Sequence, residues 1–214
     1  MTLSAPTREK ERNAGRTREL ILDAAERLFA EQGYEETSLS DVGQAAQVSR
    51  ATPGYFFGSK AELHRAVLER CFEEVRNAVR EGRERALASG QTPEVILAAA
   101  VSDYFDFLTL RPNFVKLIQR EALREDRNLD ELPLRLAVGQ EMLEALTLEL
   151  GLDPDRADDT AQFLFSLLSL TWFPQIHGAT LGRVVGLDHR TPDFIERRKR
   201  HVTQLLSGWL TNRG

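Results

Sequence analysis

The sequence predicts an all-α protein in two parts, a small N-terminal helix-turn-helix domain followed by a larger helical bundle. Apolar residues recur every three or four positions along most of the chain, which is the spacing of one helical face. No run alternates apolar and polar residues in the way that a half-buried strand does. Near the N-terminus, two short helical patterns joined by a tight turn follow a longer one, which is the order of a helix-turn-helix.

Composition indicates a cytoplasmic globular protein. Of the 214 residues, 42% are hydrophobic and 29% are charged, as in ordinary soluble domains. The single cysteine, Cys71, cannot form an internal disulfide, which fits a reducing compartment. The polar, basic N-terminus predicts no signal peptide. The strongly apolar stretch Phe163–Phe173 is shorter than the roughly 20 residues of a bilayer span, so it predicts a buried helix and no membrane partner.

Charge is distributed unevenly along the chain. The net charge is −5, yet residues 1–18 carry +3 and residues 47–65 carry +2. Two basic segments near one end of an acidic chain indicate a local contact with nucleic acid. Residues 1–16 are expected to form a flexible basic arm, and such an arm is often merely solvated, so charge alone does not decide the function.

The first helix is expected over Thr17–Gln32. Its apolar residues fall on one helical face, and Gly33 follows where a left-handed C-cap belongs. These residues are Leu20, Ile21, Ala24, Ala25, Leu28 and Phe29.

Two short helices follow, and each has a capping signal. Ser38 and Asp41 form a capping box that opens a helix over Leu39–Ala46. Ser49 is placed to cap a second helix over Arg50–Phe56. In a helix-turn-helix this second helix enters the major groove, which is about 12 Å wide, and its first turn reaches the base edges.

Within that second helix, Arg50 and Thr52 occupy the first turn. Pro53 is near enough to the helix start to remove only about one hydrogen bond. Gly54 removes a side chain, which allows a close approach to phosphates. Another capping box, beginning at Ser59, opens a long helix that carries a single apolar stripe. We place the domain boundary inside this helix, with the helix-turn-helix domain over residues 17–68.

The remaining residues, 69–214, read as larger apolar helices. They are expected to begin at Thr92–Pro93 and to cover residues 112–124, 132–150, 154–173 and 192–210. In the helix that begins at Thr92–Pro93, one core stripe is predicted, formed by Leu97, Val101, Phe105 and Leu108. Phe163–Phe173 is apolar on every side, and a helix of this kind needs two packing partners.

The N-terminal motifs resemble the DNA-binding domain of the TetR family of transcriptional regulators. The similarity covers about 50 residues, Thr17–Val67. It is carried by FAEQGY at the end of the first helix, by Thr37-Ser38, by Val48-Ser49 in the turn and by YFFGSK. The resemblance implies a DNA-facing surface, with one residue, Lys60, bound to a phosphate. That surface comprises Ser38, Ser49, Arg50, Thr52, Gly54, Tyr55 and Lys60.

Two residues depart from the family pattern. Gln47 stands where the family commonly has a turn glycine, so we expect a non-glycine residue in a left-handed conformation. Gly54 stands where the family commonly has an aromatic residue that contacts phosphate, and Tyr55 is the candidate to replace it.

The C-terminal half resembles the family's ligand-binding, dimerising half in outline only. The resemblance implies a homodimer through the last two long helices, in which Val202, Leu205, Leu206 and Trp209 form a stripe. It also implies a small-molecule effector, and the candidate residues are Tyr104, Phe107, Phe165, Ser169 and Trp172. For the aromatic candidates, plain core packing is the alternative.

These features predict a repressor that a small molecule releases from a palindromic DNA operator. A homodimer would place two recognition helices roughly 34–36 Å apart in successive major grooves. The alternative is a helical ligand-binding or enzymatic protein whose helix-turn-helix no longer reads specific DNA. Enzyme chemistry finds no motif: the four histidines are scattered, and there is no HExxH, phosphate loop or nucleophile elbow. No catalytic residue, cofactor or metal is expected.

Overall fold

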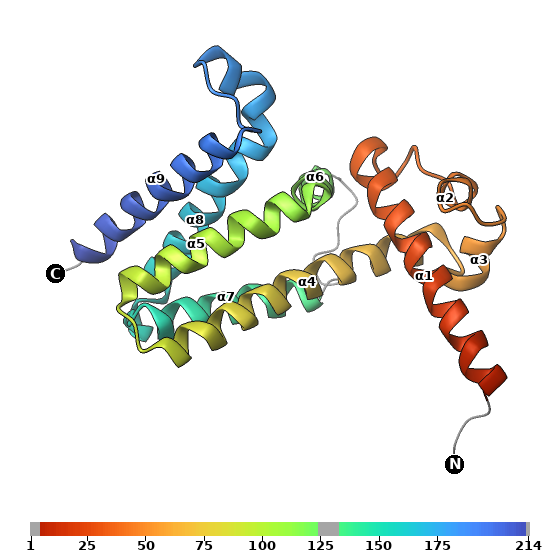
Figure 1. Cartoon of the computed structure of the whole chain (residues 1–214), viewed down its shortest axis with the longest axis horizontal. Coiled ribbons are helices and arrows are strands. Elements are labelled where there is room, and N and C mark those ends of the chain that lie inside the picture. Colours follow the sequence, from red (N-terminus) through yellow and green to blue (C-terminus); the bar gives the residue numbers. More distant parts are fainter. Residues whose placement is uncertain (1–4, 124–132, 213–214) are drawn as a thin grey trace. The chain divides into compact units, whose positions relative to one another are not determined.

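The structure is a computed structural model, which describes residues 5–123 and 133–212. Within those ranges every regular element is helical, which confirms the predicted all-α fold (Figure 1). The elements are α1 (Ala5–Gln32), α2 (Leu39–Ala45), α3 (Thr52–Phe57), α4 (Lys60–Ser89), α5 (Pro93–Leu110), α6 (Pro112–Ala122), α7 (Pro133–Glu149), η2 (Pro154–Arg156), α8 (Ala157–His177), η3 (Gly178–Gly182) and α9 (Pro192–Thr211). No helix in the described ranges is long and apolar enough to cross a membrane.

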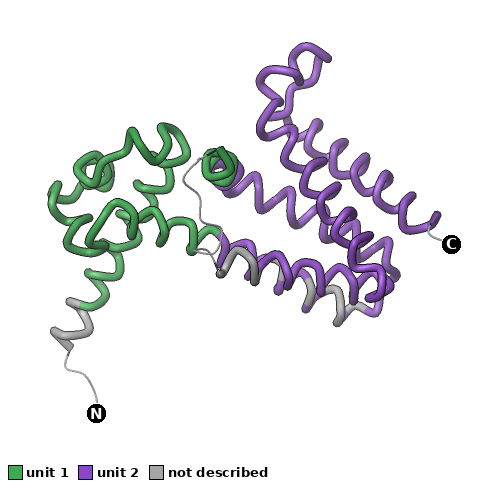
Figure 2. Tube along the Cα trace, turned by 180° about the vertical axis from the view of Figure 1, so that it is seen from behind, with its two compact units in different colours: residues 1–71, 116–127 green, residues 72–115, 128–214 purple. Residues whose placement is uncertain are grey.

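The chain forms two compact units (Figure 2). The first takes residues 1–71 and 116–127, and the second takes residues 72–115 and 128–214. Helices α4 and α6 therefore each contribute to both units. The first unit holds the predicted helix-turn-helix, together with part of a helix that lies far away in the sequence.

Helix α1 begins at Ala5, so the predicted start at Thr17 is wrong. Residues 5–16, which were expected to form a flexible arm, continue the helix. Arginine, glutamate, lysine and alanine dominate this segment, and they are strong helix formers. Pro6 falls in the first turn, where its missing N–H removes no helical hydrogen bond.

Helices α1, α2 and α4 form the core of the first unit. Their most deeply buried apolar residues are Ile21, Leu22, Ala25, Phe29, Val42, Leu63 and Val67. Beside this core, the guanidinium of Arg70 on α4 binds three carboxylates of α1. It lies 2.6 Å from Glu26, 2.7 Å from Asp23 and 3.4 Å from Glu19. These ion pairs fix the position of α4 along α1.

Gly33 ends α1 in the predicted left-handed C-cap, with φ of 91°. This end of α1 is also held by α6, because Arg120 donates hydrogen bonds to the carbonyl oxygens of Ala30 (2.9 Å) and Glu31 (2.6 Å). A Cβ at position 33 would lie only 3.1 Å from Nη1 of Arg120. Both the backbone conformation and the arginine therefore favour glycine here.

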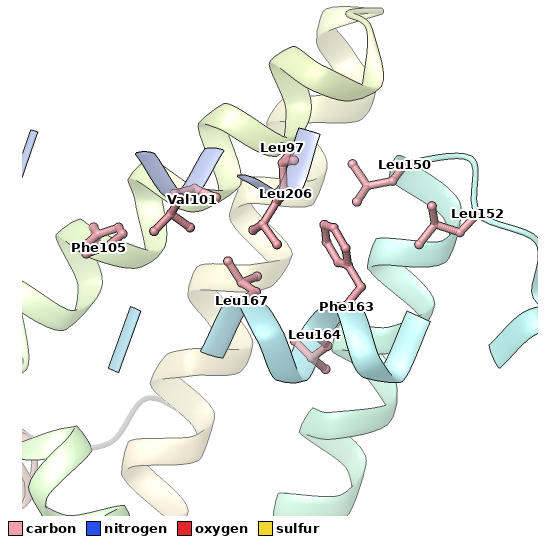
Figure 3. Close-up of a cluster of buried hydrophobic side chains, with 10 residues drawn as sticks. Leu97, Val101, Phe105, Leu150, Leu152, Phe163, Leu164, Leu167 and Leu206 are labelled. Carbon is pink, nitrogen blue, oxygen red and sulfur yellow. The ribbon is translucent and has the colours of Figure 1, made fainter. Parts of the chain in front are cut away.

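Helices α5, α8 and α9 build the core of the second unit (Figure 3). Its buried residues are Leu97, Val101, Phe105, Leu150, Leu152, Phe163, Leu164, Leu167, Val202 and Leu206. The α5 residues among them, with the buried Leu108, confirm the predicted core stripe. At the rim, the ring of Phe163 lies 4.8 Å from that of Trp209 on α9.

Helix α8 continues to His177, beyond the end predicted at Phe173. Pro174 lies inside it and cannot donate to the carbonyl oxygen of Leu170, four residues earlier. Arg198 of α9 replaces the missing donor, because its Nη2 and Nε lie 2.9 and 3.3 Å from that oxygen. A proline is tolerated here because a neighbouring helix bonds the carbonyl that it leaves free.

Candidate nucleic-acid interface and ligand cavity

The turn between α2 and α3 is tight enough to require a glycine. A Cβ on Gly43 would lie 2.9 Å from the carbonyl oxygen of Ser49 and 3.0 Å from Cα of Arg50. The N–H of Val48 donates to the carbonyl of Gly43 at 3.0 Å. Sequence reasoning missed this residue, whose only signal is a glycine inside a short amphipathic helix.

Gln47 lies in the same turn with φ of 57°, which confirms the left-handed conformation expected for it. Side chains are disfavoured there, since the Cβ crowds the backbone. Gln47 is the one non-glycine residue with positive φ in the part of the chain that the structure describes. A non-glycine residue therefore holds the left-handed conformation in this turn.

Helix α3 begins two residues later than predicted, at Thr52, and Ala51 is its N-cap. Ser49 therefore does not cap it. Its hydroxyl instead lies 2.7 Å from that of Thr52. Pro53 sits in the first turn as expected, and its side chain is buried. Arg50, which precedes the helix, is exposed.

The outer side of α3 presents Tyr55, which is 86% exposed. Its ring meets the half-buried Phe56 edge to face at 5.5 Å. Gly54 precedes it, and a Cβ there would contact only Cδ1 of Leu39, at 3.8 Å. The fold itself therefore leaves room for a side chain at position 54.

Ser38 and Asp41 form the predicted capping box of α2. The Ser38 hydroxyl donates to Oδ2 of Asp41 at 2.6 Å, and it accepts from the Asp41 N–H at 3.2 Å. Hydrogen bonds from the Ser38 hydroxyl and amide, with the charge of Arg50, hold the pKa of Asp41 below its ordinary value of 3.8. The exposed Ser38 hydroxyl is thus already oriented by the cap.

Lys60 begins α4, where its ammonium group has partners within the first unit. It donates to the carbonyl oxygens of Tyr34 (3.0 Å) and Glu35 (3.2 Å). It also lies 4.3 Å from the centre of the Tyr34 ring. An ammonium group has three N–H donors, so two bonds leave one for another acceptor. The side chain is half-buried rather than fully presented to solvent.

The second unit contains a cavity of about 330 Å³ between α4, α5, α7 and α8. Apolar walls predominate, including Ile96, Met142, Leu146, Leu164 and Leu167. Its charged lining residues are Arg85, Asp103 and Glu149. Arg85 and Asp103 form an ion pair at 2.6 Å. A mostly apolar cavity with a few polar groups is typical of small-molecule sites.

Two of the five predicted ligand residues, Tyr104 and Phe107, line this cavity. The other three do not. Phe165 is 72% exposed and Ser169 is also exposed, since on α8 the residues facing the cavity are Leu164 and Leu167. At about 100° per residue, positions 165 and 169 fall on a different side of the helix from 164 and 167.

Trp172 supports the cavity wall from behind. Its Nε1 donates to the hydroxyl oxygen of Tyr104 at 2.7 Å, and its ring lies 6.1 Å from that of Phe114. Burial raises the pKa of Tyr104 far above its ordinary value. The phenol therefore stays protonated and retains its O–H as a donor.

Comparison with known proteins places this geometry in a family. A model described as "Bacterial regulatory proteins, tetR family" matches residues 21–67. One described as "Tetracyclin repressor-like, C-terminal domain" matches residues 93–206. The HTH-type transcriptional repressor NicS of Pseudomonas putida is 30% identical over 112 residues, 52% of this chain and 51% of NicS. The biofilm regulator IcaR of Staphylococcus epidermidis is 36% identical over 52 residues, 24% of this chain and 28% of IcaR. The chain thus matches about half or less of these relatives' length.

Solved structures share the fold over nearly the whole chain. Regulator SCO4942 of Streptomyces coelicolor has a TM-score of 0.67 at 19% identity, over 90% of this chain and 97% of that one. The fatty acid degradation regulator FadR of Bacillus halodurans has a TM-score of 0.64 at 20% identity, over 89% and 97%. Since the C-terminal family model alone spans more than half of the sequence, the chain belongs to the TetR family of bacterial regulatory proteins.

Proposed function

We propose that the protein is a cytoplasmic repressor that binds a palindromic DNA operator and leaves it when a small molecule binds the second unit. The observation that carries the DNA-binding part is the exposed surface at α3. There Tyr55 projects from a short helix whose inner side is packed through the buried Pro53, and the exposed Arg50 lies two residues before the helix begins. A rigid helix of this kind can present its side chains to a major groove without rearrangement.

The remaining predicted contacts take different roles in this proposal. Ser38, Ser49 and Thr52 carry hydroxyls near the ends of α2 and α3, suited to hydrogen bonds with phosphates or bases. Lys60 contacts a phosphate through its third N–H, while its other bonds hold it against the end of α1. Gly54 lets the helix approach the backbone closely, and Tyr55 supplies the aromatic contact.

The cavity is proposed as the effector site. Its volume of about 330 Å³ lies at the small end of the range for ligand pockets, and its walls come from four helices of the second unit. An effector shifts the DNA-binding equilibrium only as far as it prefers one conformation over the other. Repression is the proposed direction: NicS is named a repressor, whereas another relative, FasR of Mycolicibacterium smegmatis, is named an activator.

A homodimer through α8 and α9 is part of the same proposal. Both helices carry large apolar side chains on their outer surfaces: Phe165 is 72%, Phe173 51% and Leu205 50% exposed. Exposed apolar side chains of this size are expected to be covered by a partner. A two-fold dimer explains why the operator should be palindromic.

In-vitro selection of bound duplex DNA tests the proposal. We expect one palindromic site, bound about a thousandfold or more tightly than random duplex at physiological salt. Arg50→Ala should weaken binding to the selected site, with Arg27→Ala, an exposed arginine elsewhere on α1, as the control. Absence of a preferred site would favour a helix-turn-helix that no longer reads DNA. Repeating the selection with candidate ligands then identifies the effector.

A further inference from the structure

The N-terminal end of α1 is a basic helix that projects beyond the helix-turn-helix. Residues 5–18 hold five basic residues against two glutamates, in a chain whose net charge is −5. Because α1 begins at Ala5, residues 5–16 extend the helix by about 18 Å before Thr17, at 1.5 Å per residue. Positive charge is therefore carried on a regular helix.

Arg18 marks the place where α1 passes α3. Its guanidinium carbon lies 5.1 Å from the centre of the Phe57 ring, at the last residue of α3. Figure 1 shows the N-terminal turns of α1 continuing beyond α3. Duplex DNA is much longer than this six-residue helix and carries a negative charge about every 1.7 Å of its axis. The partner that fits this extension is therefore the sugar-phosphate backbone of DNA on either side of the base pairs that α3 would contact.

Two arginines on the extension are exposed, Arg12 and Arg16, four residues apart on one side of the helix. Glu19, the carboxylate one turn after Arg16, lies with Arg70 and Arg18 instead, at 3.4 and 3.7 Å. The acid one turn after Arg16 is thus already shared by two other cations. Glu9 lies three residues before Arg12, and residues 5–18 together still carry a net charge of +3.

We propose that Arg12 and Arg16 bind phosphates of the DNA that flanks the base pairs contacted by α3. This inference rests on the proposed DNA-binding function and adds a contact outside the helix-turn-helix. Phosphate contacts carry no base information, so they strengthen binding to every sequence alike. Each contact displaces condensed counterions and steepens the fall of affinity with salt.

The test measures operator affinity against salt concentration for the full-length protein and for the double variant Arg12→Gln/Arg16→Gln. The slope of log affinity against log salt changes by about 0.9 per phosphate contact. The proposed dimer carries both arginines twice, so the variant loses four contacts and its slope should be about 3.6 shallower. Its preference for operator over random duplex should be unchanged. The control Arg27→Gln/Arg80→Gln removes the same charge from two other exposed arginines and should keep the wild-type slope.

Duplex length gives a second arm. On an operator trimmed of its flanking base pairs, wild type should show the shallower slope of the double variant. If wild type binds its operator but wild type and double variant have equal slopes on the long duplex, this inference is overturned while the proposed function stands. A reduced operator preference in the double variant would also overturn it, because the arginines would then contact bases. Failure of wild type to bind any DNA would overturn the proposed function with it.

Discussion

At residue 43 the protein has no room for a side chain. A Cβ there would meet the carbonyl oxygen of Ser49 at 2.9 Å and Cα of Arg50 at 3.0 Å, and these backbone atoms cannot turn aside. We expect Gly43→Ala to lower the free energy of unfolding by about 1–3 kcal/mol, the usual effect of overpacking. Urea unfolding followed by circular dichroism measures the change.

Gly54 on the next helix provides a matched control. A Cβ at that position would make only an ordinary contact with Leu39, at 3.8 Å. Since alanine favours helix over glycine, Gly54→Ala should raise the free energy of unfolding by up to about 1 kcal/mol. Equal losses in the two variants would show that steric crowding at Gly43 is not what sets the geometry of the turn.

The carboxyl of Asp41 should titrate below its ordinary pKa of 3.8, chiefly because the Ser38 hydroxyl donates to it. A lowered folded-state pKa means that the stabilisation is complete above the unfolded-state pKa and is lost as pH falls through the folded value. Ser38→Ala should return the Asp41 pKa toward 3.8, as measured by NMR titration. Arg50→Ala should move the pKa less, because its charge is the smallest of the causes. The reverse order would contradict this assignment.

At the scale of elements, Arg198 of α9 bonds α8 at the carbonyl oxygen that Pro174 leaves without a helical donor. Arg198→Met removes the donors to the carbonyl oxygen of Leu170 while keeping most of the side chain's bulk. We expect a loss of about 1–2 kcal/mol in the free energy of unfolding, because a partly buried carbonyl loses its partner. Pro174→Ala restores an N–H to α8, so Arg198→Met should cost less in that background. A double-mutant cycle measures this coupling. Additive effects would contradict the idea that Arg198 replaces the N–H that Pro174 cannot donate to the Leu170 carbonyl.

The sequence predicted most elements because their signals are local. Apolar periodicity located the α5 stripe, the capping box of Ser38 and Asp41 located α2, and Gly33 located the end of α1. One error arose where a contact between helices overrode a local signal. The helix was predicted to end at Phe173, but α8 continues through Pro174, and the Arg198 contact that permits this proline is not visible in sequence.

The candidate sites divide in the same way. The exposed position of Tyr55 followed from motifs on adjacent residues. The cavity depends on side chains from α4, α5, α7 and α8, which no sequence spacing brings together. Two residues that were predicted to bind the ligand, Phe165 and Ser169, therefore lie on the outer side of α8 and not in the cavity.

At the scale of the whole molecule, charge separates a basic end from an acidic remainder. Residues 1–18 and 47–65 are positive, which leaves the rest of the chain at −10. An acidic body is repelled by DNA, so the basic residues orient the approach as well as strengthening it. The basic residues that contact DNA release condensed counterions, so affinity for DNA should fall steeply as salt rises.

The proposed dimer is tested by placing a charge on its surface. Phe165→Arg on α8 and Leu205→Arg on α9 should each turn a dimer of 24.2 kDa chains into monomers in light scattering, because burying an unpaired charge costs more than the contact returns. Operator affinity should fall when the dimer is lost, since a monomer binds one half-site. Leu110→Arg is the control, because Leu110 is 79% exposed but lies at the end of α5. Dissociation by Leu110→Arg alone would move the interface away from α8 and α9, and a monomeric wild type would remove it altogether.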